Sequence, residues 1–355
     1  MTNVLVRRAL RGALSRVRHV SPVPPASADG PVAAVYDATE RDFGLLAPPV
    51  ALHSPDPRLL AAAWLMLRET LVATGRMARA DKEAVATAVS EANRCPYCAE
   101  VHGATLHGLL AGGTEGAGTG RSHTGPGGSP GRPGDPAPPW PAPVPSVQVP
   151  EAVGVAVTFH YLNRVVNVFL GEPPVPSSAP EPARRASRLV LGRILRARAG
   201  GHHEPGRSLD LLPAARLPDD LAWAAPAPTV AGALARAAAA IEDAADGAVP
   251  EPVRGLVRDR IGSWDGSPTD LGLTWLDEAL AHLSPEDRPP GRLALLTALA
   301  SYRVDERTVA PLRRAGYGDR ELVALVAWAA FTAARRAGAR LAPPAGRTTP
   351  PAPTP

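Results

Sequence analysis

The sequence predicts an all-α protein. Hydrophobic residues make up 45% of the 355 residues and charged residues 20%, as is typical of a globular chain. Aromatic residues make up only 4%, whereas Ala and Leu are abundant and runs of β-branched residues are short. Because Ala and Leu favour helices while β-branched and aromatic residues favour strands, helices should predominate. A chain of this length can bury one large core or two ordinary domains.

Three helices are expected in the first quarter of the chain, over about residues 31–43, 58–73 and 80–93. Asp56 is a candidate cap for the second helix, and Pro57 suits its first turn. That helix is apolar over most of its circumference, which predicts burial in a bundle or an oligomer. The third helix has a small apolar face that allows close packing, with Glu83 in its first turn.

The next expected helix, about residues 94–110 with Asn93 as its candidate cap, carries the only two cysteines of the chain, Cys95 and Cys98. Cysteines three apart on a helix have Cα atoms about 5 Å apart, a separation that a disulfide accepts. A thiol in the first turn of a helix lies at the positive end of the backbone dipole, which lowers its pKa. His102 lies one turn beyond Cys98 on nearly the same face, so the dithiol has a proton acceptor beside it. The pattern predicts a redox-active dithiol.

These residues resemble a known active-site signature. The pattern Glu83-x11-Cys95-Pro96-Tyr97-Cys98-x3-His102 is similar to that of the alkylhydroperoxidase D-like branch of the carboxymuconolactone decarboxylase superfamily. The broader similarity covers about residues 35–112. Its five-position spacing is far more specific than a lone C-x-x-C. Members are all-helical and commonly oligomeric, and those with the dithiol reduce hydroperoxides.

The resemblance also implies a role for each residue of the signature. Cys98 would be the peroxidatic thiol and Cys95 the resolving thiol, while Glu83 and His102 would form a proton relay to Cys98. Some members carry a histidine immediately before the second cysteine, where this chain has Tyr97. Tyr97 is therefore expected to line the pocket rather than to donate a proton.

The resemblance further implies the partners of the protein. The expected substrate is a hydroperoxide, and the expected reductant is an external dithiol or a thioredoxin-like or lipoyl protein. No metal, flavin or haem cofactor is required. A homo-oligomer is expected, with a trimer as the common family assembly.

The remainder of the chain divides by composition. Residues 1–110 form the helical region with the cysteines, and residues 111–150 contain ten Gly and ten Pro, which predicts a flexible linker in which His123 and Trp140 have no role. Residues 151–342 are expected to complete the bundle, before a disordered tail at 343–355. Helices in this second half are expected over about residues 152–170, 182–199, 229–246, 250–262, 291–302, 306–315 and 319–338.

The second half contains a segment similar in sequence to the helix before the cysteines. Residues 319–326 parallel residues 81–88. At the same offset, the positions of the two cysteines and of His102 are taken by Ala333, Arg336 and Arg340. We therefore expect a degenerate second repeat that supplies structure but no second site.

Four functions besides a dithiol peroxidase remain open. A zinc site could use Cys95, Cys98, His102 and His107 by ligand type. On one helix, however, His107 projects about 120° away from Cys95, which leaves three ligands, or four with Glu83. The chain could also be a thiol–disulfide oxidoreductase, a cofactor-free lactone decarboxylase that needs no dithiol, or a non-catalytic binding protein with a redox or zinc switch.

Charge and hydropathy exclude other classes of protein. The net charge is a modest +4 and the basic residues are scattered, so no nucleic-acid partner is expected. No segment reaches the roughly 18 apolar residues of a membrane span. Residues 1–20 are basic but lack a secretory h-region, and a helix there is expected to pack on its own domain. A cytoplasmic location is expected, where a C-x-x-C pair cycles between thiol and disulfide.

Overall fold

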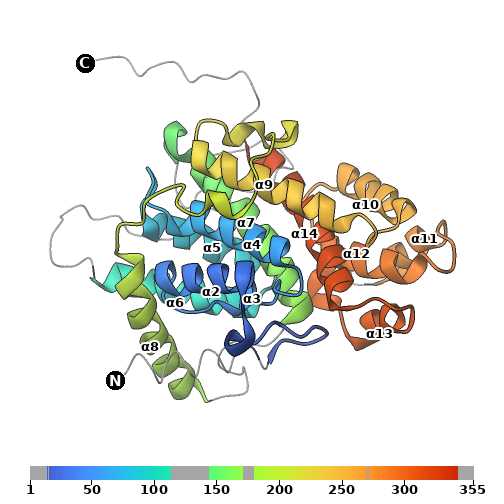
Figure 1. The fold of residues 1–355 in the computed structure, drawn as a ribbon, viewed down its shortest axis with the longest axis horizontal. Coiled ribbons are helices and arrows are strands. Elements are labelled where there is room, and N and C mark those ends of the chain that lie inside the picture. The colour runs from blue at the N-terminus through green and yellow to red at the C-terminus, as the bar shows by residue number, and fades with distance from the viewer. Residues whose placement is uncertain (1–13, 15, 113–143, 171–179, 270–271, 343–355) are drawn as a thin grey trace.

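The computed structural model describes residues 14, 16–112, 144–170, 180–269 and 272–342. Within these residues every regular element is a helix, which confirms the all-α prediction (Figure 1). Most of the predicted linker, with His123 and Trp140, and the predicted tail lie outside the described residues.

The α-helices are α2 (Gly30–Asp42), α3 (Pro48–Ala51), α4 (Pro57–Leu67), α5 (Arg79–Ala92), α6 (Pro96–Gly112), α7 (Val149–Phe169), α8 (Glu181–Ala199), α9 (Pro228–Ala245), α10 (Glu251–Ser263), α11 (Thr274–Leu280), α12 (Arg288–Ala300), α13 (Glu306–Arg314) and α14 (Asp319–Leu341). A π-helical segment, η3 (Arg68–Val72), extends α4. The 3-10 turns are η2 (Pro25–Ser27), η4 (Ser146–Gln148), η5 (Leu209–Leu211), η6 (Asp219–Ala224) and η7 (Ser301–Arg303). The long helices match the predicted ones, whereas α3, α11 and the 3-10 turns were not predicted.

The start of α4 is fixed as the sequence predicts. The Asp56 side chain accepts hydrogen bonds from the main-chain N–H groups of Arg58 and Leu59, at 2.8 and 3.3 Å. Pro57 occupies the first turn, where a missing N–H costs nothing. The other Asp56 oxygen pairs with Arg320 of α14 at 2.9 Å. All residues of α4 from Leu59 onward are buried, which confirms the expectation of a helix inside a bundle.

Helix α7 lies in the middle of the molecule, with α5 and α14 packed against it (Figure 1). All its residues are buried except Val149 and His160. One continuous hydrophobic cluster includes residues from Val20 to Ala334, on both sides of the predicted linker. The two predicted helical regions therefore share one core, and their exact boundaries stay a prediction.

Helix α8 crosses α6 at close range because both helices carry glycine at the crossing. A methyl group at Gly108 would lie 2.7 Å from the Gly192 carbonyl oxygen. A methyl group at Gly192 would lie 2.5 Å from the Ala104 carbonyl oxygen. The bare backbones thus allow α8 to place Leu191 and Leu195 beside the first turns of α6.

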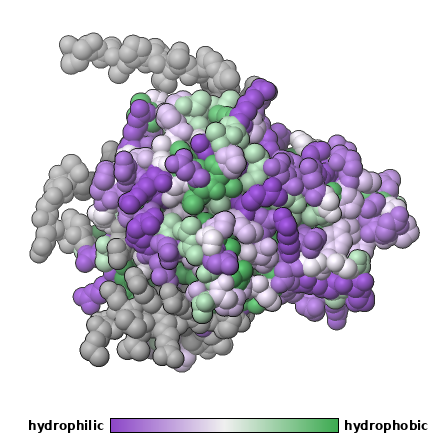
Figure 2. All heavy atoms as spheres, in the orientation of Figure 1, coloured by the Kyte–Doolittle hydropathy of each residue, from purple (hydrophilic) through white to green (hydrophobic). Residues whose placement is uncertain are grey.

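Helix α14 is the core helix of the second half. Within the described ranges it is the one helix long and apolar enough to cross a membrane, but 78% of its most apolar window is buried in the protein. The visible surface is mostly hydrophilic, with hydrophobic side chains gathered near the middle of the view (Figure 2). These features are typical of a helix in the core of a globular bundle.

The predicted internal repeat is only partly reflected in the helices. Helix α14 begins at Asp319, where the similarity to residues 81–88 predicts the start of a helix. It then continues without interruption to Leu341, whereas the first copy is broken between α5 and α6. A common origin of the two segments stays a prediction.

Candidate functional site

The segment before α5 is tied to α7 by one carboxylate. The main-chain N–H groups of Arg76 and Met77 donate to the two oxygens of Glu151, at 2.8 and 3.0 Å. Lys82 of α5 lies 3.4 Å from the same carboxylate. These contacts fix α5 against α7 and hold the next residue, Glu83, inside the protein, with none of its surface exposed.

The turn between α5 and α6 brings the cysteines to the start of a helix. Arg94 adopts a left-handed backbone conformation, with φ of 51°, and α6 begins at Pro96. Asn93 does not cap α6, so that prediction was wrong. Its side-chain amide instead donates to Asn163 Oδ1 of α7 at 3.0 Å, because α7 presents polar side chains at this turn. The residue directly before α6 is Cys95.

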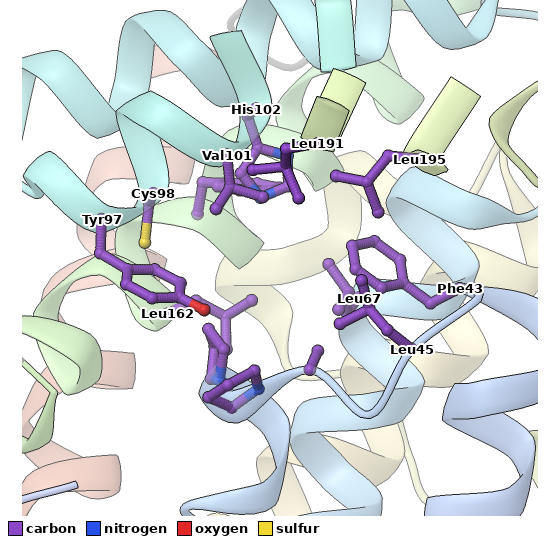
Figure 3. A pocket seen from close by; sticks show the side chains of 14 residues that line it. Phe43, Leu45, Leu67, Tyr97, Cys98, Val101, His102, Leu162, Leu191 and Leu195 are labelled. Carbon is purple, nitrogen blue, oxygen red and sulfur yellow. The ribbon is translucent and has the colours of Figure 1, made fainter. Parts of the chain in front are cut away.

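The two thiols lie side by side but face different surroundings. Cys95 Sγ donates a hydrogen bond to Cys98 Sγ, 2.8 Å away, and both residues are free thiols. They are almost fully buried, with 1% of Cys95 and 3% of Cys98 exposed. Only Cys98 lines the adjoining cavity, and Figure 3 shows its sulfur directed into that space.

The pKa of Cys95 differs from the value that its position at a helix start alone predicts, because the thiol is buried. Burial, followed by the hydrogen bond to Cys98, raises the pKa of Cys95 well above its ordinary value. The expectation that the helix dipole lowers the pKa of a thiol at this turn is therefore wrong for Cys95, because loss of solvation outweighs the dipole. Cys95 keeps its proton near neutral pH.

His102 and Glu83 form a buried pair. His102 Nδ1 and Glu83 Oε2 are 2.7 Å apart, and Arg79 Nε donates to the other Glu83 oxygen at 2.8 Å. Burial opposes ionisation of Glu83, but the charges of Arg79 and His102 outweigh it and hold the pKa of this carboxyl below its ordinary value. A carboxylate on Nδ1 selects the tautomer whose Nε2 is the basic nitrogen. The Phe159 ring meets the imidazole edge-on, with centroids 4.5 Å apart, and helps to fix its orientation.

The cavity beside Cys98 is small and apolar, with a volume of about 50 Å³. The polar side chains that line it are those of Cys98, His102 and Tyr97 (Figure 3). Burial raises the pKa of the Tyr97 phenol, so it stays protonated. The apolar wall consists of Phe43, Leu45, Ala47, Pro48, Pro49, Leu67, Val101, Phe159, Leu162, Leu191 and Leu195. This arrangement suits a molecule with an apolar body and a small polar group.

Comparison with known proteins identifies the family. A sequence profile of the carboxymuconolactone decarboxylase family matches residues 58–114, which include Glu83, both cysteines and His102. The chain is also 42% identical over 333 residues to a Mycobacterium tuberculosis protein named alkyl hydroperoxide reductase, an alignment that covers 91% of this chain and 94% of that protein. The chain belongs to the carboxymuconolactone decarboxylase family. No solved structure matches it.

Membership of this family confirms the resemblance read from the cysteine segment, but several residues of the site were not found from the sequence. Arg79 lies four residues before Glu83, so helical spacing could have revealed it. Asn163 and Phe159 lie on α7, more than 55 residues after the cysteines. Only the packing of α7 against α5 and α6 brings them to the site.

The zinc hypothesis gains no support from the geometry. His107 is exposed on α6, away from the buried thiols. His102 already contacts the Glu83 carboxylate through Nδ1. Among the residues that the structure describes, no group of three or more Cys, His, Asp or Glu side chains is arranged to hold a metal ion.

Proposed function

We propose that this protein reduces organic hydroperoxides with the Cys95–Cys98 dithiol. One observation carries the proposal: of the two thiols, only Cys98 faces the apolar cavity, and His102 lines that cavity one helical turn away. The name of the Mycobacterium tuberculosis relative supports a peroxide-reducing activity. The apolar wall favours a hydroperoxide with an alkyl or aryl substituent over hydrogen peroxide.

The first step oxidises Cys98. His102 Nε2 takes the Cys98 thiol proton, and the Glu83 carboxylate stabilises the resulting imidazolium. The thiolate attacks the terminal oxygen of the hydroperoxide and the O–O bond breaks. The alkoxide that leaves takes the proton back from His102 and departs as an alcohol, while Cys98 becomes a sulfenic acid.

The second step forms the disulfide. Cys95 Sγ already lies 2.8 Å from Cys98 Sγ and attacks it. The S–O bond breaks, and the hydroxide that leaves combines with the Cys95 proton to give water. The high pKa of Cys95 keeps this thiol protonated until Cys98 has been oxidised. An external dithiol, of the thioredoxin or lipoyl type, supplies the two electrons that reduce the disulfide. A homo-oligomer and a cytoplasmic location remain predictions.

Thiol counting after a hydroperoxide chase tests the proposal. The reduced protein is mixed with cumene hydroperoxide, and residual thiols and peroxide are measured over time. The proposal predicts loss of two thiols for each hydroperoxide consumed, and no consumption by the Cys98→Ser variant. Consumption that persists in Cys98→Ser would sink the assignment.

Two competing activities predict different results. A thiol–disulfide oxidoreductase would react with a model disulfide faster than with cumene hydroperoxide. A lactone decarboxylase of this family would retain activity after replacement of both cysteines by Ala. The cavity beside Cys98 disfavours a decarboxylase, because the described residues that line it include no Lys or Arg to pair with the carboxylate of such a substrate.

A further inference from the structure

A second cavity, of about 100 Å³, lies on the other face of α7. Phe159 and Leu162 line the cavity beside Cys98, whereas His160 and Arg164 line this one. Since successive helical residues advance by about 100°, these two pairs project to roughly opposite sides of α7. The remaining wall comes from the α5–α6 turn, the end of α12 with η7, and the segment that follows α10. The second cavity is therefore separate from the thiol site.

Arg164 places a buried positive charge on this cavity, with only 5% of the residue exposed. Its Nε donates to the Ala298 carbonyl oxygen at 2.9 Å. Its Nη1 donates to the His160 carbonyl oxygen at 2.8 Å and to Asn93 Oδ1 at 3.1 Å. Burial lowers the pKa of Arg164 to about 10, so the guanidinium is still charged near neutral pH.

The partners of Arg164 leave its charge uncompensated. Three of them are neutral oxygens, and the fourth is Nδ1 of the neutral His160 ring, 3.2 Å from Nη1. No residue of the described chain accepts from Nη2 or offers a carboxylate within ion-pair distance. Removing a guanidinium from water is costly unless an anion replaces the lost hydration. An arginine in this condition on the wall of a cavity indicates a ligand that carries negative charge.

A second arginine lies at the same cavity. The left-handed turn at Arg94 directs its guanidinium over the ring of Tyr302, 4.7 Å from the centroid, and both residues line the cavity. Among the described residues that line it there is no Asp or Glu. Two guanidinium groups therefore face this space without an acidic side chain between them, and each can hold an oxyanion through parallel N–H donors.

The other lining groups add a neutral donor and aromatic surface. His160 Nδ1 lies 3.1 Å from the Asn93 amide nitrogen and 3.2 Å from Arg164 Nη1. Because the guanidinium can only donate, Nδ1 is the acceptor and the proton lies on Nε2. Burial, then the charge of Arg164, lowers the pKa of His160 to about 3, so the ring stays neutral. Trp264 lies on the other side, with its ring centroid 5.7 Å from the Arg164 guanidinium. Trp264 and Tyr302 offer flat apolar surface beside the two charges.

We propose that this cavity binds a small oxyanion, a carboxylate or a phosphate, between Arg164 and Arg94. The open Nη2 of Arg164 donates to the anion from the floor of the cavity, and Arg94 donates from its rim. Trp264 and Tyr302 flank the body of the ligand. The inference uses no part of the thiol chemistry and is independent of the proposed peroxidase function.

Calorimetric titration of the full chain tests the proposal. Benzoate and inorganic phosphate are titrated separately, in a buffer without other oxyanions. We expect saturable binding of at least one of them, and the preferred anion identifies the ligand class. The Arg94→Gln variant should bind it about 10- to 100-fold more weakly, since one charge-assisted hydrogen-bonding group is lost. Gln at this position meets the same left-handed backbone as Arg, so the turn is retained.

Two further variants make the test specific. Arg303→Gln removes the same charge from the vicinity of Tyr302, 5.9 Å from its ring centroid, but Arg303 does not line the cavity, so affinity should be unchanged. Arg164→Met should abolish binding, and circular dichroism verifies that this variant folds. If it does not fold, the comparison of Arg94→Gln with Arg303→Gln alone tests whether the anion binds in this cavity. The proposal is overturned if neither anion shows saturable binding up to about 10 mM. Equal weakening by Arg94→Gln and Arg303→Gln would also overturn it, because that result indicates only general charge attraction.

Discussion

The surroundings of Cys95 and of Cys98 differ although the two residues are separated by a single turn of chain. Cys95 sits at the junction of α5 and α6, near the polar side chains of Asn93 and Asn163, where burial raises its pKa. Cys98 lies in the first turn of α6, and its sulfur faces an apolar cavity that His102 also lines. One thiol is thus enclosed by protein and the other is presented to a ligand.

Through this difference in surroundings, the two cysteines of a symmetric motif acquire distinct roles. The C-x-x-C spacing places both cysteines at the start of the same helix, but it does not assign them different roles. The distinction comes from the helices around them: Val166 of α7 and Leu170 directly after it pack in one cluster with the cysteines, and a space bordered by α7 and α8 lies beside Cys98 only. Substitutions can test this division of roles.

Replacement of each cysteine in turn should give unequal results. Cys98→Ser should lower the rate of hydroperoxide reduction at least about 1,000-fold, because the nucleophile is lost. Cys95→Ser should still consume one equivalent of hydroperoxide and then stop, because no disulfide can form. Rapid mixing with cumene hydroperoxide, with residual peroxide as the readout, measures both. If both variants consumed the same amount of hydroperoxide in the first turnover, the two thiols would not have different roles.

Removal of the base should have the next largest effect. His102→Gln should lower the rate of Cys98 oxidation by about 100- to 10,000-fold, the usual contribution of a general base. His107→Gln provides a matched control, since His107 is an exposed histidine on the same helix. A stopped-flow rate that falls equally in both variants would contradict a specific role for His102.

A change in the apolar wall should alter substrate preference by a smaller factor. Leu195→Ala removes apolar contact from the cavity side opposite Cys98 (Figure 3). The kcat/KM for cumene hydroperoxide should fall about tenfold, whereas that for hydrogen peroxide should change little. The ratio of the two values is the measurement, and an unchanged ratio would mean that the cavity does not hold the organic group.

The smallest effect should appear in the dependence of stability on pH. The pKa of Glu83 is lowered in the folded protein below its ordinary value of 4.5, so this carboxylate stabilises the fold above pH 4.5 and loses that contribution as the pH falls through the folded-state pKa. Arg79→Gln removes the attractive charge and raises the pKa of Glu83. Urea unfolding should therefore show a larger loss of stability for the variant at pH 7 than at pH 4. An equal loss at both values would mean that Arg79 acts through packing alone.

The sequence contains enough information to predict the local parts of this site. The cap at Asp56 and the helix entry at the cysteines follow from short-range rules, because the residues concerned are neighbours in the chain. The pairing of Glu83 with His102 was expected only through family resemblance, since nothing in the spacing brings α5 beside α6.

Contacts between distant helices could not be predicted in the same way. Asn93 suits a helix cap by type, yet it contacts α7, because the nearest donors and acceptors come from a helix that begins more than 50 residues later. The place of Leu195 in the cavity wall depends on the glycine crossing of α6 and α8. Hydrophobic periodicity identifies a buried face but not the partner against which it packs.

Trapping of the sulfenic acid identifies the thiol that reacts with the hydroperoxide. Cys95→Ser and Cys98→Ser proteins are each treated with one equivalent of cumene hydroperoxide in the presence of dimedone, and the labelled residue is identified by mass spectrometry. We predict a dimedone adduct on Cys98 in the Cys95→Ser protein and no adduct in the Cys98→Ser protein. An adduct on Cys95, or none in either variant, would contradict the assignment of Cys98 as the thiol that reacts with the hydroperoxide.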